Sequence, residues 1–189
     1  MEGNMVIKAM EQKILKKIIE MVNQKKTLFS FSASSLVAER KNPIERTYEI
    51  LETIGRGGYG EVKKILHKEL NVIRALKILK KANYRSKQEV AQLRNEIQIM
   101  KIVDHPNIVK LFEFYEDENT FFLVTEYVNG GPLLEHIQKQ KIMSENIAAK
   151  IMIQLLSAIN HCHKNKVVHR DIKPDNILVE LLQDKQGEM

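Results

Sequence analysis

The sequence is poor in cysteine and has no long apolar run. Cys162 is the single cysteine in 189 residues, so no disulfide can form within the chain, and a reducing compartment is favoured. A bilayer span needs about 18 consecutive apolar residues, and no stretch here approaches that length. The N-terminus has neither a signal-peptide pattern nor a glycine at position 2 for myristoylation. We therefore expect a cytoplasmic protein, with Cys162 as a core residue.

A strong charge of one sign is also missing from most of the chain. The formal net charge is +6, but residues 1–46 alone carry nine basic and five acidic side chains. The remaining residues are close to balanced, so nucleic-acid binding is not expected. Apolar residues make up 43% and charged residues 29%, which is the composition of a folded globular protein.

The first 47 residues are predicted to form a leader of their own. Apolar side chains at Ile7, Met10, Ile14, Ile18 and Met21 recur in steps of three and four, which predicts a helix over residues 6–24. Three readings stay open: a helix packed on a domain, a partly disordered leader, or a basic amphipathic helix that contacts a membrane or an acidic partner. The following "TLFSFSASS" is typical of a linker.

From about Tyr48 the pattern changes to short apolar runs separated by turn residues. These runs predict strands at residues 48–55, 61–68, 72–79, 108–117 and 120–128. Ser86 and Glu89 form a capping box that predicts a helix start, and Pro106 ends that helix. Residues 133–140 predict a short helix. Residues 144–165 predict a long, buried helix with Ser144 as its N-cap. The fold class is therefore α+β in two lobes, a mostly antiparallel sheet with one helix followed by a helical region.

A glycine motif follows the first predicted strand. Gly55, Gly57 and Gly60 have G-x-G-x-x-G spacing, and glycine lets the backbone approach a bulky anion. Alone, the motif also fits a tight hairpin or a dinucleotide fingerprint. The fingerprint needs a helix after the glycines, but a strand is predicted here, so dinucleotide binding is not expected.

Lys77 lies within an apolar strand, where a lysine is costly to bury without an anionic partner. The partner could be a phosphate, or a carboxylate such as Glu96 in the following helix. The alternative is that Lys77 extends to solvent and Glu96 is an ordinary surface charge. The nearby glycines favour the first interpretation.

The segment "HRDIKPDN" gathers Asp171, Lys173 and Asn176 within six positions. A carboxylate can accept or orient a hydroxyl proton, and an asparagine oxygen can ligate magnesium, which prefers oxygen donors. A lysine can neutralise charge on a transferring phosphoryl group. As a unit, the segment favours phosphoryl-transfer chemistry over a plain surface loop.

Together "GRGGYGEV", "ALKIL", Glu96 in a helix and "HRDIKPDN" resemble the eukaryotic protein kinases in order and spacing over residues 48–180. Lysine two positions after the aspartate resembles the serine/threonine branch. "DHPNIVKLFEFYEDENTFFLVTEY" and "VVHRDIKPDNIL" are most similar to the calcium-dependent and calmodulin-dependent kinases. The resemblance implies a complete N-lobe at residues 48–127, a hinge at about 126–131 and the first part of a helical C-lobe at 132–189.

The resemblance also implies the role of each site residue. Gly55, Gly57 and Gly60 would cover the ATP phosphates, and Lys77 would hold them while paired with Glu96. The residues around the adenine would be Ile54, Val62, Ala75 and Leu178, with Thr125 as gatekeeper and the backbone of Glu126 and Val128 at the hinge. Asp171 would be the catalytic base, Lys173 a γ-phosphate contact and Asn176 a ligand of Mg²⁺.

Two departures from the family pattern limit these expectations. Pro132 stands where many relatives have a glutamate that contacts ribose or a basic substrate residue, and Glu135 is a candidate substitute. The chain also ends before a "DFG" element, and it has no EF-hand pattern. We therefore expect a truncated serine/threonine kinase that acts on a protein substrate with ATP and is inactive by itself. The alternative is a non-catalytic nucleotide-binding or regulatory module.

Overall fold

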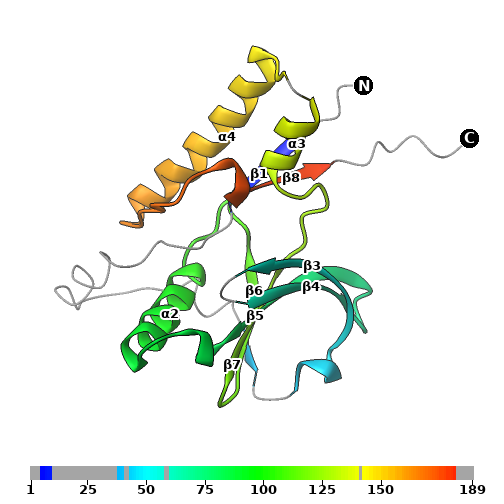
Figure 1. The fold of residues 1–189 in the computed structure, drawn as a ribbon, viewed down its shortest axis with the longest axis vertical. Coiled ribbons are helices and arrows are strands. Elements are labelled where there is room, and N and C mark those ends of the chain that lie inside the picture. The colour runs from blue at the N-terminus through cyan, green and yellow to red at the C-terminus, as the bar shows by residue number, and fades with distance from the viewer. Residues whose placement is uncertain (1–4, 10–37, 41–42, 58–59, 141, 182–189) are drawn as a thin grey trace, which may run out of the picture. The chain divides into compact units, whose positions relative to one another are not determined.

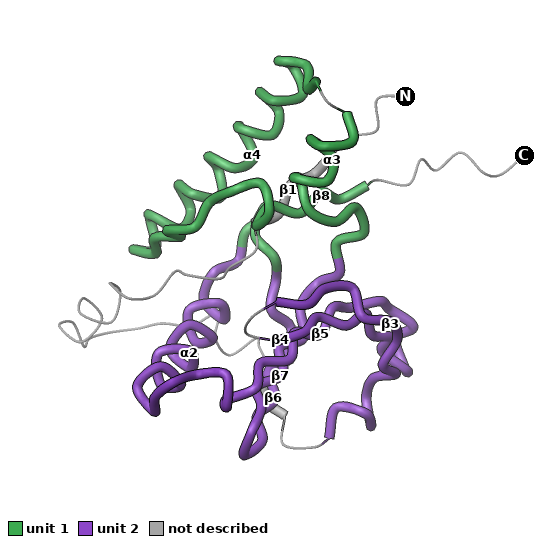
Figure 2. Tube along the Cα trace, viewed as in Figure 1, with its two compact units in different colours: residues 1–21, 105–109, 128–189 green, residues 22–104, 110–127 purple. Residues whose placement is uncertain are grey.

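The computed structural model describes residues 5–9, 38–40, 43–57, 60–140 and 142–181. The chain divides into two compact units, which Figure 2 colours separately. Unit 1 comprises residues 1–21, 105–109 and 128–189, and unit 2 comprises residues 22–104 and 110–127. The boundary between Tyr127 and Val128 falls within the segment expected to act as a hinge.

Unit 2 is built on a six-stranded sheet with the strand order β2-β6-β7-β5-β4-β3 (Figure 1). The strands are β2 (Ala38–Arg40), β3 (Tyr48–Gly57), β4 (Gly60–His67), β5 (Val72–Lys80), β6 (Leu111–Glu116) and β7 (Thr120–Glu126). Short 3₁₀ turns at Ile44–Arg46 and Lys81–Asn83 flank them. All neighbouring strands are antiparallel except β2, which runs parallel to β6. The five antiparallel strands, with one helix inserted between β5 and β6, confirm the predicted α+β class.

Strand β2 was not predicted, because residues 38–40 were placed in the linker. A three-residue strand is too short to show the alternation of apolar and polar residues by which strands are recognised. Its register on β6, from Ala38 opposite Glu113 to Arg40 opposite Tyr115, is set by backbone pairing.

Helix α2 (Lys87–Met100) begins where the capping box predicts. The Ser86 hydroxyl accepts the Glu89 backbone N–H at 3.2 Å, which satisfies one of the free donors of the first turn. The Glu89 carboxylate in turn accepts the Arg85 N–H at 2.8 Å, one residue earlier than in the standard box. The helix start is therefore fixed from both sides.

Two apolar clusters hold the sheet of unit 2. The cluster that includes α2 consists of Leu79, Leu93, Ile97, Leu111, Phe114, Phe121 and Leu123. The second cluster consists of Ile44, Tyr48, Ile65, Leu76, Tyr115 and Val124. Leu76 and Leu79 belong to different clusters because residues an odd number apart on a strand point to opposite faces. Unit 2 thus buries both faces of β5.

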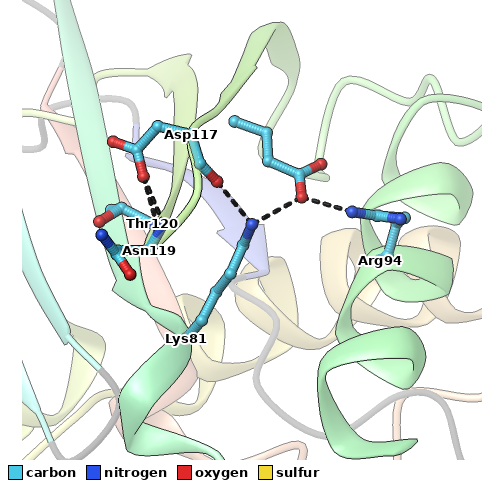
Figure 3. Close-up of polar contacts among 6 residues, drawn as sticks. Lys81, Arg94, Asp117, Asn119 and Thr120 are labelled. Carbon is cyan, nitrogen blue, oxygen red and sulfur yellow. Dashed lines mark hydrogen bonds and ion pairs between the residues drawn. The ribbon is translucent and has the colours of Figure 1, made fainter. Parts of the chain in front are cut away.

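A charged cluster at the β6–β7 hairpin fixes α2 to the sheet (Figure 3). The Glu116 carboxylate accepts hydrogen bonds from Lys81, the first residue of the 3₁₀ turn after β5, and from Arg94 on α2. Burial alone would raise the pKa of Glu116, but these two donors hold it below its ordinary value. The Asp117 carboxylate closes the hairpin by accepting the N–H groups of Asn119 and Thr120 at 2.8 and 2.7 Å.

Unit 1 contains α3 (Leu133–Gln140), α4 (Glu145–Lys164), the 3₁₀ turn η4 (Pro174–Asn176) and a two-stranded sheet of β8 (Ile177–Leu181) with β1 (Met5–Ala9). Figure 1 shows β1 and β8, from opposite ends of the chain, side by side. Its core consists of Leu133, Ile151, Leu155, Ile177 and Val179. Ser144 caps α4 by accepting the Ile147 N–H, as predicted.

The predicted helix over residues 6–24 is wrong at its start, because Met5–Ala9 forms strand β1. The apolar residues do recur in steps of three and four, but the first of them lies in "MVIKA", where two adjacent β-branched residues favour a strand. Pairing with β8 then satisfies its backbone. The rest of that prediction, residues 10–24, lies outside the described residues. None of the described helices is long and apolar enough to cross a membrane.

Helix α4 is buried on one face only, whereas the sequence predicted a buried helix. Ile151, Leu155, Ala158 and Cys162 form the buried stripe, which confirms Cys162 as a core residue. On the other face Ile153 is 68% and Leu156 is 55% exposed. Nothing among the residues that the structure describes covers these two side chains.

The Glu116 cluster predicts how stability depends on pH. Because the folded state lowers the pKa of Glu116 from 4.5, its contribution is present above that pH and is lost as the pH falls through the folded value. Glu116→Gln should reduce the free energy of unfolding by about 1 kcal/mol at pH 7, and the difference from the parent should shrink toward pH 3. Urea denaturation at several pH values measures this.

Glu118→Gln, on the same hairpin but exposed, is the matched control and should match the parent at every pH. Equal effects of the two substitutions at pH 7 would contradict a specific role for Glu116.

Candidate functional site

Several predicted nucleotide-binding residues of unit 2 lie on one face of its sheet. Val62 on β4 lies opposite Lys77 on β5, and Lys77 lies opposite Leu123 on β7. Directly opposite residues in antiparallel strands share a face. Leu123 belongs to the cluster that contains α2, so this row lies on the face that α2 covers. Ala75 and Thr125 form the next row on the same face.

Glu96 on α2 lies within electrostatic reach of Lys77. Burial raises the pKa of the Glu96 carboxyl, and the positive charge of Lys77 lowers it, with burial the stronger influence. Burial disfavours the ionised form of a carboxyl group, and a nearby cation stabilises that form. The structure thus brings together the two charges that were paired from the sequence. The helix that carries Glu96 is held in place by the ion pair between Arg94 and Glu116.

The three glycines differ in what they allow. A Cβ on Gly57 would meet nothing within 4 Å, and one on Gly55 would make ordinary contact with Val62 at 3.8 Å. A Cβ on Gly60 would lie 1.9 Å from the carbonyl oxygen of Ile78. Gly60 is therefore required by the close approach of β4 to β5, a packing role that the motif alone does not reveal.

The remaining predicted adenine contacts of unit 2 differ in exposure and in hydrogen bonding. Ile54 is 43% exposed and lies in the irregular part of the β3–β4 pairing, between Thr53 and Gly55. Thr125 is buried, and its hydroxyl donates to the Glu126 carbonyl at 3.2 Å. The Glu126 N–H donates to the Lys110 carbonyl, so only the carbonyl of this residue fits the predicted hinge contact.

In unit 1 the loop before β8 brings Asp171, Lys173 and Asn176 together. The Asn176 amide nitrogen donates to the Asp171 carbonyl at 2.8 Å and to its carboxylate at 3.0 Å. The Lys173 ammonium lies 3.4 Å from the same carboxylate. The turn is closed by the Asn176 N–H donating to the Lys173 carbonyl. The arrangement holds one carboxylate between an amide donor and a cation.

Two further residues shape this loop. His169 is buried, and its Nδ1 accepts the Asp171 backbone N–H at 3.3 Å. Arg170 has a φ of 62°, the left-handed region that side chains rarely adopt. Neither residue is among the predicted site residues. The histidine could have been found from its place beside the aspartate, but a positive φ at arginine has no signal in the residue pattern.

The donor set of this loop fits a magnesium ion in part. Asn176 donates through its nitrogen, which leaves its side-chain oxygen outside those bonds, and Asp171 supplies a carboxylate. Magnesium is usually held by one or two such groups together with the phosphates of a nucleotide. Among the described residues no cluster of three or more histidine, cysteine, aspartate or glutamate side chains could hold a metal without a nucleotide.

Val128 and Leu178, the other predicted adenine contacts, belong to unit 1. Val128 is buried, and Leu178 forms a single bridge with Pro132. Pro132 thus lies in the backbone pairing next to β8, at the position where the family pattern has glutamate.

Comparison with known proteins agrees with the geometry. The family model described as "Protein kinase domain" matches residues 48–186. The chain belongs to the protein kinase family. The glycine strand, the lysine strand, the Glu96 helix and the aspartate loop are all within the matched residues.

Similar proteins include calcium-dependent protein kinases and a human kinase. Calcium-dependent protein kinase 5 of Plasmodium berghei is 40% identical over 153 residues, 78% of this chain and 27% of the relative. Calcium-dependent protein kinase 4 of Plasmodium falciparum is 41% identical over 133 residues, 70% and 25% respectively. Human NUAK family SNF1-like kinase 1 is 34% identical over 140 residues, 74% and 21%. The chain thus spans about a quarter of the length of these relatives.

The glycines generate a stability prediction. Gly60→Ala should lower the free energy of unfolding by about 1–3 kcal/mol, because its Cβ would overlap the Ile78 carbonyl. Gly57→Ala should change it by less than about 1 kcal/mol, because that Cβ meets nothing. Thermal or urea unfolding distinguishes them, and equal losses would contradict the assigned packing role of Gly60.

Proposed function

We propose that this kinase chain binds ATP with magnesium and carries the catalytic base of a serine/threonine protein kinase. The observation that carries the proposal is the aspartate loop. The carboxylate of Asp171 is fixed by the Asn176 amide and lies beside the Lys173 ammonium. Such a carboxylate is suited to orient a substrate hydroxyl and accept its proton.

Each charged group of the loop then has a separate task. Asp171 would accept the proton of the protein hydroxyl, and Lys173 would stabilise negative charge on the γ-phosphoryl group during transfer. The oxygen of Asn176 would ligate magnesium, which neutralises charge on the phosphates when bound. The 3.4 Å separation of Lys173 and Asp171 keeps cation and base close to the same reacting hydroxyl.

In unit 2, the nucleotide-binding part of the proposal rests on the Lys77 row. Lys77 would bind the α- and β-phosphates, with Glu96 restraining its ammonium, while Gly55 and Gly57 let the backbone cover them. Val62 and Ala75 would contact the adenine from the same face of the sheet. Serine/threonine specificity is supported by Lys173 two positions after the aspartate, as in the serine/threonine branch, and by the similarity to calcium-dependent protein kinases.

Because the 189 residues alone are expected to be inactive, the test of catalysis uses a version of this kinase with a complete kinase domain, and measures transfer of radiolabelled phosphate from ATP to a general protein acceptor such as casein. Lys77→Met and Asp171→Asn should each lower the rate at least about 100-fold, because the first removes the cation that would bind the α- and β-phosphates and the second removes the base that would accept the hydroxyl proton. Asn at position 171 keeps an oxygen that can accept the Asn176 hydrogen bond, so the loop shape is retained. Parent-like rates in both variants would contradict the assigned roles.

Nucleotide binding is tested separately by calorimetric titration of the 189-residue chain with ATP and magnesium. Gly57→Ala should weaken binding about tenfold through contact with the phosphates, although its stability is unchanged. Glu118→Gln serves as the surface control with parent affinity.

A second candidate is a non-catalytic nucleotide-binding or regulatory module. The exposed Ile153 and Leu156 on α4 favour it, because an apolar helix face of this kind is suited to a protein partner. Magnesium-dependent ATP binding without phosphate transfer, in the same two assays, would support this candidate over the first.

A further inference from the structure

The segment from His105 to Ile108 is bonded to one face of α4, within unit 1. The Nε2 atom of His105 lies 3.1 Å from the Ser157 hydroxyl oxygen, and the Asn107 side-chain amide donates to the Gln154 side-chain oxygen at 3.0 Å. Ile108 is buried, and its backbone N–H donates to the His105 carbonyl at 3.0 Å. Because Gln154 and Ser157 are three positions apart on a helix, they lie on the same face. The segment is therefore docked on α4 by polar and apolar contacts together.

The ring of His105 also contacts the ring of His161, four positions after Ser157 on α4. The ring centroids are 5.1 Å apart, and the ring planes are inclined by 40°. The Asn165 side-chain amide, at the end of α4, donates to Nε2 of His161 at 3.2 Å. An amide nitrogen can only donate, so this Nε2 carries no proton and the His161 ring is neutral in the docked state.

The hydrogen bonds of His105 likewise require its neutral form. The backbone N–H of Asn107 donates to Nδ1 of His105 at 3.1 Å. A backbone N–H can only donate, so Nδ1 carries no proton, and the proton of the ring is on Nε2 beside Ser157. A second proton, on Nδ1, would set two donors against each other, and the bond to Asn107 would be lost.

The surroundings of His105 also oppose its protonation. Partial burial lowers the pKa of His105 from 6.5, and the nearby His161 lowers it further because two like charges repel. The other ionisable groups that flank the two histidines along the chain are Asp104, Lys110, His163 and Lys164. Asp104 and Lys110 form an ion pair with each other at 3.2 Å, and the other two are exposed.

From these contacts we propose that the His105–His161 pair is a pH-sensitive switch, which holds residues 105–108 on α4 while both rings are neutral and releases them when His105 takes up a proton. Histidine is the side chain whose ordinary charge change falls between about pH 5 and pH 8. The docked state binds this proton more weakly than the released state. Docking is therefore strongest above pH 6.5 and weakens as the pH falls from there through the lowered pKa of His105.

The place of the segment in the chain gives the switch a possible output. Residues 105–108 lie between the end of α2 at Met100 and the start of β6 at Leu111. Their release would free the link between these two elements from α4. A consequence for phosphate transfer would rest on the proposed function, because α2 carries Glu96, whereas the release itself does not.

The test measures hydrogen exchange of the full 189-residue chain at about pH 7.5 and about pH 5, with each rate divided by the intrinsic rate at that pH. The protection of the Ile108 amide should fall at least about tenfold at the lower pH. The Val179 amide, which is bonded to Gly131 in unit 1, should keep its protection within about threefold. An equal fall at Val179 would indicate acid unfolding of the whole unit and would overturn a local switch.

His105→Asn tests the histidine itself, because an asparagine oxygen accepts the N–H two residues on at any pH. In this variant the pH-dependent change at Ile108 should shrink to less than about threefold. His163→Asn, the same substitution at an exposed histidine of α4, is the matched control and should keep the full response of the parent. A full response in His105→Asn, or its loss in the control, would contradict the proposal.

An NMR titration of the histidine rings covers the case in which His105→Asn loses protection at both pH values. In the parent, the His105 ring should titrate with a midpoint below 6.5, and the Ile108 amide shift should follow the same midpoint. In His161→Phe, which keeps a ring but removes its charge, the midpoint should rise.

A parent midpoint at or above 6.5, or the same midpoint in His161→Phe, would overturn the switch. Because no readout involves ATP or phosphate transfer, these outcomes are independent of the proposed function.

Discussion

The hydrogen-bond register of β4, β5 and β7 is the constraint that places the Lys77 row of unit 2 on one face of the sheet. A shift of one residue in a strand moves every side chain to the opposite face. The observed register puts Lys77 in a row with Val62 and Leu123 and leaves Leu76 for the second cluster. Because both faces of β5 are buried, a shift of its register would cost free energy. It would place Lys77 in the cluster around Ile65 and a leucine beside Glu96.

The arrangement of the aspartate loop in unit 1 depends on local bonds rather than on a sheet. Its carboxylate, amide and ammonium lie within six residues, and the turn closes on itself through Asn176. That is why this part of the site could be predicted from sequence: the chemistry and the geometry are encoded in one short segment. The pairing of Lys77 with Glu96 was harder, because it joins a strand to a helix, yet a lysine in an apolar strand requires an anionic partner.

The features that could not be predicted from the sequence depend on pairing between distant segments or on backbone conformation. Strands β1 and β2 form by pairing with distant strands, and neither is long enough to show a period of its own. The role of Glu116 depends on Lys81 and Arg94 converging from two other elements. Likewise, the demand for glycine at position 60 comes from the Ile78 carbonyl of the neighbouring strand, although the motif itself suggested only a role toward phosphate.

The backbone of Arg170 holds a local strain. Glycine would occupy a φ of 62° without steric conflict, whereas an arginine there costs about 1–2 kcal/mol. The contacts around the loop must offset that cost. The residue directly before Asp171 is therefore held in a conformation set by its surroundings and not by its own backbone preference.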